Sequence, residues 1–264
     1  MTPRNARKTT HWLFLNSGDI SQSELRMNYI SWLGLSLSVI AILLLGASGL
    51  GYRLGMWGFK TGISLVKYAA YISLAAVVVC LLALALWAAG TFPGGMTPAL
   101  IGMVIGGFVS VWMLMWKRNL DRVPYIHDIT TDTENPPLFV AVLPLRAGAP
   151  NPAEYGGPEL AKQQKDGYPD LMPGSVSSSP EATFPRALQA AKDMGWEIVA
   201  SDPKALRIEA TDTTLWFGFK DDVVVRLTPS PTGSRIDVRS VSRVGKSDVG
   251  TNARRIKAYL AKVA

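Results

Sequence analysis

Three stretches of the sequence are almost entirely apolar and are long enough to cross a lipid bilayer. Residues 30–50, 68–89 and 97–116 contain no charged side chain. A bilayer core about 30 Å thick needs roughly 20 helical residues, because each residue adds about 1.5 Å of rise. Buried helices of a soluble bundle would show polar stripes at the helical period, and these stretches lack them. The sequence therefore predicts three transmembrane helices, at about residues 30–50, 66–89 and 97–116.

The side chains in and around these stretches fit the same interpretation. Aromatic residues, which prefer the headgroup layer, lie near the ends of the stretches: Tyr29, Trp32, Trp57, Tyr68, Trp87, Trp112 and Trp116. Gly102 and Gly106 form a GxxxG motif, for which we expect packing within the three-helix bundle rather than dimerisation. Cys80, the single cysteine, is expected to be a small apolar filler. The lipid bilayer is thus the first partner that the sequence predicts.

We infer the orientation of the chain in the membrane from its first helix. A signal peptide does not fit, because about 28 polar residues precede the first apolar stretch. Basic residues are nearly balanced between the two sides, but the first helix usually dominates. We therefore expect residues 1–28 in the cytoplasm and, after three crossings, an extracytoplasmic C-terminal domain in a membrane of the bacterial inner-membrane type.

Charge and composition narrow the chemistry further. The 264 residues carry a formal charge of +7, with 18% charged residues, one cysteine and two histidines. This composition excludes a disulfide-rich scaffold, a zinc ribbon and a disordered chain. The charge is unevenly distributed along the chain. Residues 226–264 hold 9 basic and 2 acidic side chains, whereas residues 117–225 hold 11 basic and 16 acidic side chains.

The half that follows the helices divides into two segments. Residues 117–180 are dense in Pro, Gly and Ser and predict an extended exit segment and a surface linker, with one short edge strand at residues 138–143. Residues 181–264 predict a small α+β domain: an antiparallel sheet of four to five strands with two helices on one face. The expected order is a helix at 183–194, strands at 196–201, 206–211, 215–219, 222–228 and 234–241, and a helix at 249–263. Gly218 is expected to form a bulge in the third strand.

The residues of the last two expected strands predict how these strands pair. If Pro229 lies opposite Ser234, then Leu227 faces Ile236 on the buried side of the hairpin. Arg226 then lies opposite Asp237 on the other side, as a pair of matched charges. Asp248 is the expected N-cap of the final helix.

Several separate motifs resemble one known family. The motifs are IHDITT at 126–131, YPDLMP at 168–173, GWEI at 195–198, RIEATDTT at 207–214, FGFKDDVVVR at 217–226 and SVSRVGKSD at 240–248. Together they are similar to the domain-of-unknown-function family 1499, over about residues 124–262. The resemblance implies an extracytoplasmic domain carried behind membrane helices or a secretion signal. It implies no activity, because the family has none established.

Basic side chains gather around the start of the final helix. The candidates for binding an anion or a partner are Arg239, Arg243, Lys246, Ser247, Asp248, Arg254 and Arg255. One interpretation is a site for an anionic lipid headgroup, a polyanion or an acidic partner, because a helix N-terminus favours anions. The other is a solvated basic face in which Asp248 caps the helix. A phosphate-binding P-loop is incomplete here, because Ser240 stands where that motif needs glycine.

Carboxylates offer the remaining chemistry. Asp221, Asp222 or Asp248 could act as acid and base in an envelope enzyme, although adjacent strand residues point to opposite faces. His127 and Asp128, with nearby acids, are a minor candidate for a metal site. A Ser-His-Asp hydrolase is not expected, since no histidine occurs in residues 128–264.

The function that we expect from the sequence is a non-catalytic binding or assembly module at the membrane surface. The surface of Arg239, Arg243, Lys246 and Arg255 would contact another membrane or envelope protein or an anionic lipid. Two alternatives remain open: an envelope enzyme, and a carrier of an apolar or lipid ligand between the sheet and its helices. No cofactor is expected, and nucleic acid is not expected as a partner.

Overall fold

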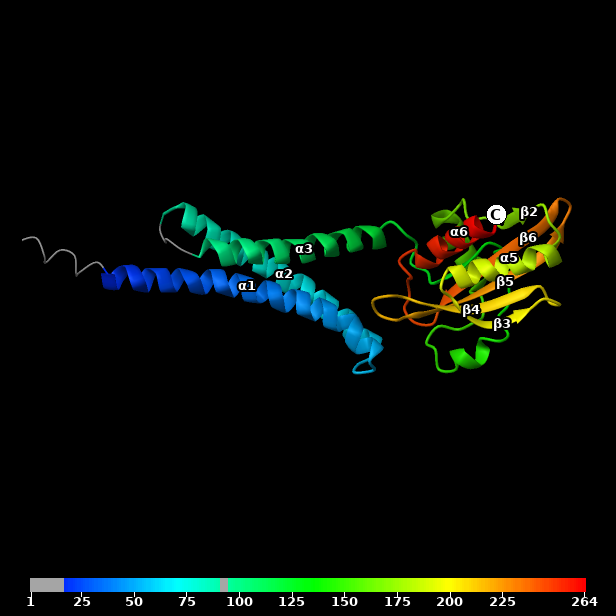
Figure 1. Ribbon diagram of the computed structural model, residues 1–264, viewed down its shortest axis with the longest axis horizontal. Coiled ribbons are helices and arrows are strands. Elements are labelled where there is room, and N and C mark those ends of the chain that lie inside the picture. The colour runs from blue at the N-terminus through cyan, green and yellow to red at the C-terminus, as the bar shows by residue number, and fades with distance from the viewer. Residues whose placement is uncertain (1–16, 91–94) are drawn as a thin grey trace, which may run out of the picture. The chain divides into compact units, whose positions relative to one another are not determined.

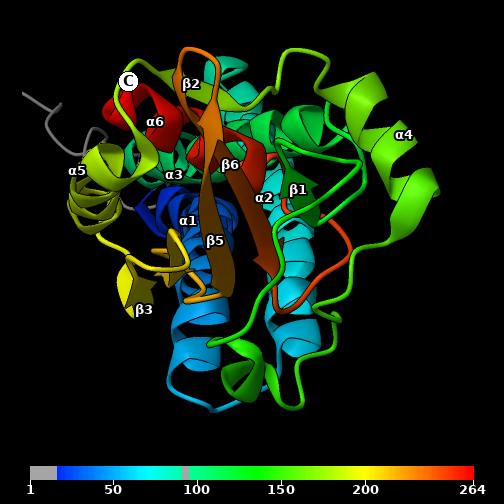
Figure 2. The same ribbon diagram turned by 90° about the vertical axis from the view of Figure 1, so that its right-hand side faces the viewer.

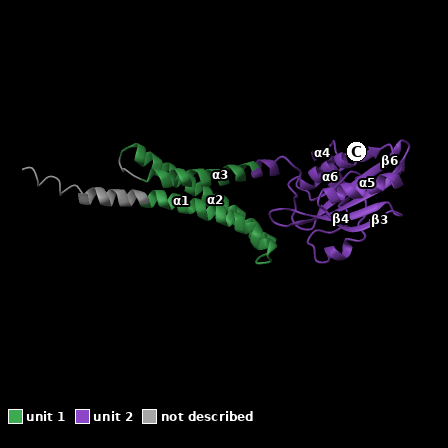
Figure 3. Ribbon diagram, in the orientation of Figure 1, with its two compact units in different colours: residues 1–115 green, residues 116–264 purple. Residues whose placement is uncertain are grey.

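The computed structural model describes residues 17–90 and 95–264, which divide into two compact units. The first unit comprises residues 1–115 and the second residues 116–264 (Figure 3). Most of the expected cytoplasmic segment, residues 1–16, lies outside the described part of the chain.

The first unit consists of three long apolar helices, as the sequence predicts (Figure 1). They are α1 (Ser17–Arg53), α2 (Phe59–Ala88) and α3 (Met96–Leu120). All three are long and apolar enough to cross a membrane. Large apolar side chains point outward, and Leu43, Val78 and Val104 are 65%, 64% and 70% exposed. Such an outer surface is suited to lipid tails rather than to water.

Small side chains fill the space between these helices. Those buried include Ala41, Ala69, Ala76, Cys80 and Ala99. A Cβ atom at Gly102 would lie 2.8 Å from Sγ of Cys80 and 3.0 Å from the backbone of Leu35. The hydroxyl of Ser38 donates to the carbonyl of Gly102 at 2.7 Å. The GxxxG motif therefore packs within the bundle, as predicted, because only glycine permits this approach.

The second unit contains an antiparallel sheet of six strands. The strands are β1 (Asp128–Thr130), β2 (Gly174–Val176), β3 (Glu197–Asp202), β4 (Arg207–Thr213), β5 (Lys220–Ser230) and β6 (Gly233–Ser242). The order across the sheet is β1-β6-β5-β4-β3, and β2 also pairs with β6. Figure 2 shows β1 beside β6, with α4 (Gly157–Gly167) at that edge of the sheet.

Two helices cover one face of this sheet, and the main core lies between them and the strands. They are α5 (Pro180–Asp193) and α6 (Thr251–Val263). The rings of Trp196 and Tyr259 stack at 5.0 Å in this core. The expected antiparallel sheet with two helices on one face is confirmed, with two further strands.

The predicted hairpin register is also confirmed. Pro229 pairs with Ser234, and Arg226 pairs with Asp237 across β5 and β6. The Arg226 guanidinium lies 3.0 Å from the Asp237 carboxylate. The matched charges therefore sit on one face of the hairpin while Leu227 and Ile236 enter the core on the other.

The segment expected to be an exit and linker, residues 117–180, is instead largely part of the folded unit. It supplies β1, β2, α4 and a short 3-10 helix, η1 (Leu143–Arg146). Gln164 of α4 holds β1 by accepting from the Thr130 N–H at 2.9 Å and donating to its carbonyl at 2.6 Å. Leu171 enters the main core. The linker expectation is wrong because side chains distant in sequence satisfy this irregular backbone.

Two of the predicted strands are not formed. Residues 138–143 are not a strand, because the backbone N–H groups of Val140 and Val142 bond to the Glu209 carboxylate. Residues 215–219 form a turn between β4 and β5. Gly218 has a φ of +71° in this turn and is not a bulge within a strand.

We predict that Gly102→Leu destabilises the helical bundle by about 1–3 kcal/mol, because the new side chain would overlap the backbone of α1 and the thiol of Cys80. Thermal unfolding of the full chain in mild detergent measures the effect. Gly107→Leu is the matched control, since a Cβ atom there meets no atom within 4 Å. Equal loss of stability in both variants would contradict this packing.

Candidate functional site

Alternation along the strands gives the sheet a second face that carries charged side chains. On β6, Ile236 and Val238 face the main core, whereas Arg235, Asp237 and Arg239 point the other way. Residues 131–153, here termed the covering segment, pass over this second face, which we call the ionic face. In Figure 1 the part of the covering segment that holds η1 lies on the side of the strands opposite α6.

Arg239 lies at the centre of the ionic face and is fully buried. Its guanidinium donates to both carboxylate oxygens of Asp128, at 2.9 and 2.8 Å, and to the carbonyl of Ala153 at 2.8 Å. The rings of Phe139 and Tyr155 pack against it, at 5.1 and 5.4 Å from Cζ to the ring centroids. Burial raises the pKa of Tyr155 to about 12, so this ring remains neutral. The expectation that Arg239 is part of an exposed basic surface is therefore wrong.

Asp222 joins a second buried cluster on the ionic face. Its carboxylate accepts from Arg146 at 2.6 Å, from Arg243 at 2.9 and 2.8 Å, and from the Thr211 hydroxyl at 2.7 Å. Burial opposes ionisation, but these donors outweigh it and hold the pKa of Asp222 below its ordinary value. A carboxylate with four charged or polar donors and no solvent exposure is poorly suited to take up and release a proton.

Glu209 ties the covering segment to β4. Its carboxylate, 1% exposed, accepts from the N–H groups of Val140 and Val142, each at 3.0 Å. The Arg207 guanidinium lies 3.1 Å away. The sequence alone did not identify this role, because the residues that Glu209 holds lie almost 70 positions earlier in the chain.

Asp221 and Arg255 form a third cluster, on the helix side of the sheet. Arg255 of α6 lies 2.6 Å from the Asp221 carboxylate and 2.7 Å from that of Asp212. It also donates to Ser240 at 3.1 Å and to Asn252. Arg255 is only 5% exposed, so its expected place on an exposed basic surface is wrong too.

Residues 246–254 hold the start of α6. Asp248 accepts from the N–H groups of Gly250 at 2.8 Å and Asn252 at 2.7 Å, so it caps the helix although Gly250 occupies the N-cap position. Burial raises the pKa of Asp248, against the effect of these two donors. The hydroxyl of Ser247 accepts from the Val249 N–H at 3.2 Å. Arg254 donates to the carbonyl of Val249 at 3.1 Å.

The seven candidates for anion or partner binding are therefore divided rather than gathered. Arg239 and Arg243 belong to the ionic face, and Arg255 lies on the other side of the sheet. Lys246 and Arg254 are exposed near the start of α6, where Ser247, Asp248 and Arg254 bond to local backbone. Adjacent aspartates neutralise the charges of Arg239, Arg243 and Arg255, so these three arginines do not form an exposed basic surface.

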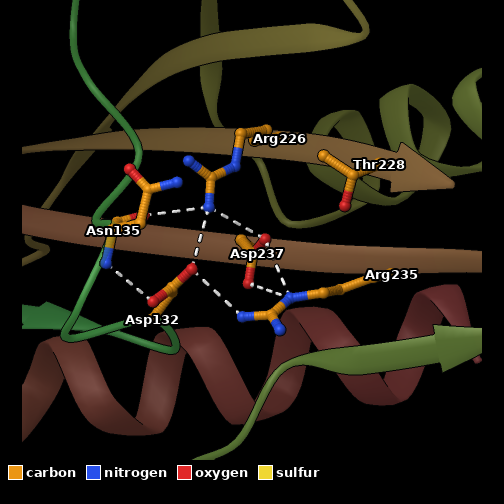
Figure 4. A pocket seen from close by; sticks show the side chains of 6 residues that line it. All are labelled: Asp132, Asn135, Arg226, Thr228, Arg235 and Asp237. Atoms are coloured by element: carbon orange, nitrogen blue, oxygen red, sulfur yellow. Dashed lines mark hydrogen bonds and ion pairs between the residues drawn. The ribbon is translucent and has the colours of Figure 1, made fainter. Parts of the chain in front are cut away.

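An open hollow of about 360 Å³ lies at the end of the ionic face that the covering segment leaves accessible. Six side chains line it: Asp132, Asn135, Arg226, Thr228, Arg235 and Asp237 (Figure 4). Two arginines and two aspartates balance in charge there. The sequence predicted only the Arg226–Asp237 pair of this group.

Four ion-pair contacts fix the geometry of the hollow. Arg226 lies 3.1 Å from Asp132 and 3.0 Å from Asp237. Arg235 lies 3.1 Å from Asp132 and 3.0 Å from Asp237, so the four side chains form a closed ring (Figure 4). Nε of Arg226 is buried without a hydrogen-bond partner, so one donor beside the hollow is unused. The hollow therefore offers guanidinium donors and carboxylate acceptors that are already held in ion pairs.

The carboxylates proposed as metal ligands instead pair with basic side chains. Asp128 accepts both of its charge-assisted hydrogen bonds from Arg239. Asp132 and Glu134 pair with Arg226 and Lys165. Within residues 17–90 and 95–264, no group of three or more His, Cys, Asp or Glu side chains could hold a metal ion. The His127–Asp128 metal hypothesis therefore has no supporting geometry.

Comparison with known proteins identifies one family. A family model described as "Protein of unknown function (DUF1499)" matches residues 128–263. The match begins at the first residue of β1 and extends through α6, so it includes the covering segment and the whole sheet. Searches of curated proteins and of solved structures found no match.

We predict that Asp222→Asn destabilises the second unit by about 3–5 kcal/mol at neutral pH, because Arg146 and Arg243 would then be buried without a counter-charge. Since the folded-state pKa of Asp222 lies below the ordinary 3.8, its stabilisation is present above that pH and is lost as the pH falls through the folded-state pKa. The difference between wild type and variant should therefore narrow below about pH 4.

Urea unfolding of the detergent-solubilised chain, followed by near-ultraviolet circular dichroism, measures this difference. Asp166→Asn is the control, because Asp166 forms an exposed pair with Lys162. We expect the control to unfold like the wild type at every pH. A variant that matched the wild type at pH 7 would show that the Asp222 cluster does not support the fold.

Proposed function

The chain belongs to the DUF1499 family of proteins of unknown function, and from the chemistry of its own side chains we propose that its sheet domain is a non-catalytic binding or assembly module at a membrane surface. The proposal rests on the partners of three carboxylates, those of Asp221, Asp222 and Asp248. Asp221 and Asp222 are buried in arginine pairs, and Asp248 caps a helix. None of the three is placed to serve as the acid or base of an envelope enzyme.

The space that an apolar ligand would need is filled with side chains. Between the sheet and its helices, Phe184, Trp196, Ile256 and Tyr259 are each at most 5% exposed and belong to one core. The Tyr259 hydroxyl donates to the carbonyl of Ala187 at 2.9 Å, which ties α6 to α5. These contacts favour a binding module over a carrier of apolar or lipid ligands.

We assign binding to the hollow of Asp132, Asn135, Arg226, Thr228, Arg235 and Asp237. Its charges cancel, so a partner must both donate and accept hydrogen bonds rather than simply supply negative charge. A polar segment of another membrane or envelope protein meets that requirement better than an anionic lipid headgroup does. Arg235 is an accessible donor at the hollow, since its side chain is 44% exposed.

We also propose that this module lies on the extracytoplasmic side. Three crossings would place the domain on the side opposite the polar segment that precedes the first apolar stretch. The first helix, which usually dominates the orientation, favours a cytoplasmic location for that segment. The family resemblance seen in the motifs supports the same side.

We predict that Arg235→Ala lowers recovery of the bound protein about 5- to 30-fold, the loss typical of one central polar contact. Affinity purification of the full chain from membranes in mild detergent, with quantitative mass spectrometry, measures the recovery. Lys257→Ala is the matched control, because Lys257 is 46% exposed and forms a single ion pair with Asp170. If wild type, variant and control recover the same proteins in the same amounts, the hollow is not the binding surface.

A reporter enzyme that is active only outside the cytoplasm, fused after Ala264, tests the side of the membrane. We expect activity from this fusion. The same reporter in a form that is active only in the cytoplasm should be silent at this position. The reverse pattern would place the sheet domain in the cytoplasm and overturn this part of the proposal.

A further inference from the structure

The turn between β4 and β5, residues 214–219, presents apolar side chains at one end of the sheet. We call it the aromatic loop, since it contains Trp216, Phe217 and Phe219. Leu215 is 89% exposed, the highest value among the large apolar residues of the described chain. Trp216 and Phe219 are partly exposed, and Phe217 is buried. A water-soluble turn would normally carry polar residues here.

Hydrogen bonds and ring contacts brace the aromatic loop, and its Trp216 ring also meets Trp116 of α3 edge-on at 6.4 Å. Thr214 donates its N–H to the Phe219 carbonyl at 2.8 Å, and its hydroxyl accepts from the Phe219 N–H at 2.9 Å. Gly218 donates to the Thr214 carbonyl at 2.9 Å. Phe217 stacks on Phe219 at 4.8 Å and meets the Trp216 ring edge-on at 4.8 Å. The loop therefore displays Leu215 with little conformational entropy left to lose on binding.

The sheet register places this loop at the end where the chain enters from the third helix. Asp128, the first residue of β1, pairs with Val241, which in turn pairs with Asp222 near the start of β5. The aromatic loop immediately precedes β5. Residues 121–127 join the last residue of α3 to β1, and a fully extended chain of that length reaches only about 25 Å.

We propose that the aromatic loop inserts into the headgroup layer of the membrane that the three helices cross, and so orients the sheet domain on the bilayer. The occupant of this surface is the lipid interface, because the short connection keeps the same end of the sheet near it. Trp and Phe favour that layer. Two exposed basic side chains, Lys220 at the start of β5 and Arg122 in the connection from α3, suit the lipid phosphates. This site is separate from the hollow and does not depend on the binding partner proposed there.

Site-specific labelling of the full chain in lipid vesicles tests the insertion. In a Cys80→Ser background, which removes the single native cysteine, one cysteine is introduced by Leu215→Cys, Lys220→Cys or Thr232→Cys. Thr232 is the control, since it lies in the turn between β5 and β6 at the opposite end of the sheet. Each cysteine receives an environment-sensitive fluorophore in vesicles of phosphatidylcholine and phosphatidylglycerol, with or without lipids that carry a nitroxide below the headgroup.

We expect the nitroxide lipids to quench the label at position 215 at least about twofold more than at 232, with position 220 between them. Equal quenching at 215 and 232 would overturn the proposal. If the Leu215→Cys chain is not obtained as a monodisperse protein, positions 220 and 232 are compared in the same way, and equal quenching there overturns it too.

A further variant distinguishes insertion of the loop into the lipid from mere proximity of the loop to the bilayer. Leu215→Asp combined with the label at position 220 places a charge where the loop would enter the lipid. We expect quenching at 220 to fall toward the value at 232. Unchanged quenching would mean that the connection to α3 alone brings this end of the sheet near the bilayer, and the insertion would be rejected.

Discussion

The second unit depends on neutralising the charges that its sheet carries on the ionic face. Arg239 is fully buried, and an arginine can be buried only when a carboxylate lies within contact distance. Asp128 supplies that carboxylate from β1, a strand more than 100 residues earlier in the chain. Glu209 binds the covering segment by its backbone N–H groups. The covering segment is thus held by charge and hydrogen-bond partners and also by apolar packing, since Phe139 and Val142 pack with Val224 and Val241.

The same requirement determines the surroundings of the buried carboxylates. Catalytic carboxylates keep a pKa near the working pH and retain access to a proton donor or acceptor. Here Asp221 and Asp222 are each bound by guanidinium groups and shielded from solvent. At the hollow, Arg226 and Arg235 reach the surface while Asp132 and Asp237 hold their guanidinium groups. A ring of this kind positions donors in advance of a partner, which reduces the entropy lost on association.

Features that depend on neighbouring residues could be predicted from the sequence, and those that depend on distant residues could not. Apolar length predicts the three helices, and alternation with a matched charge pair predicts that Arg226 faces Asp237. The burial of Arg239 could not be predicted, because nothing near it in sequence identifies Asp128 as its partner. The covering segment resembles a linker in composition, since Pro and Gly prevent regular strands. Its order comes from Glu209 and from Asn151, which donates to the Ser242 and Gly245 carbonyls.

The seven residues between α3 and β1 also limit where the sheet domain can search for a ligand. A domain attached this closely samples a thin layer of solvent, so a partner embedded in the same membrane meets it at a far higher local concentration than a freely diffusing one. Weak contacts at the hollow could then suffice for stable assembly in the bilayer. Dissociation constants measured with a detached domain would not include this gain in local concentration.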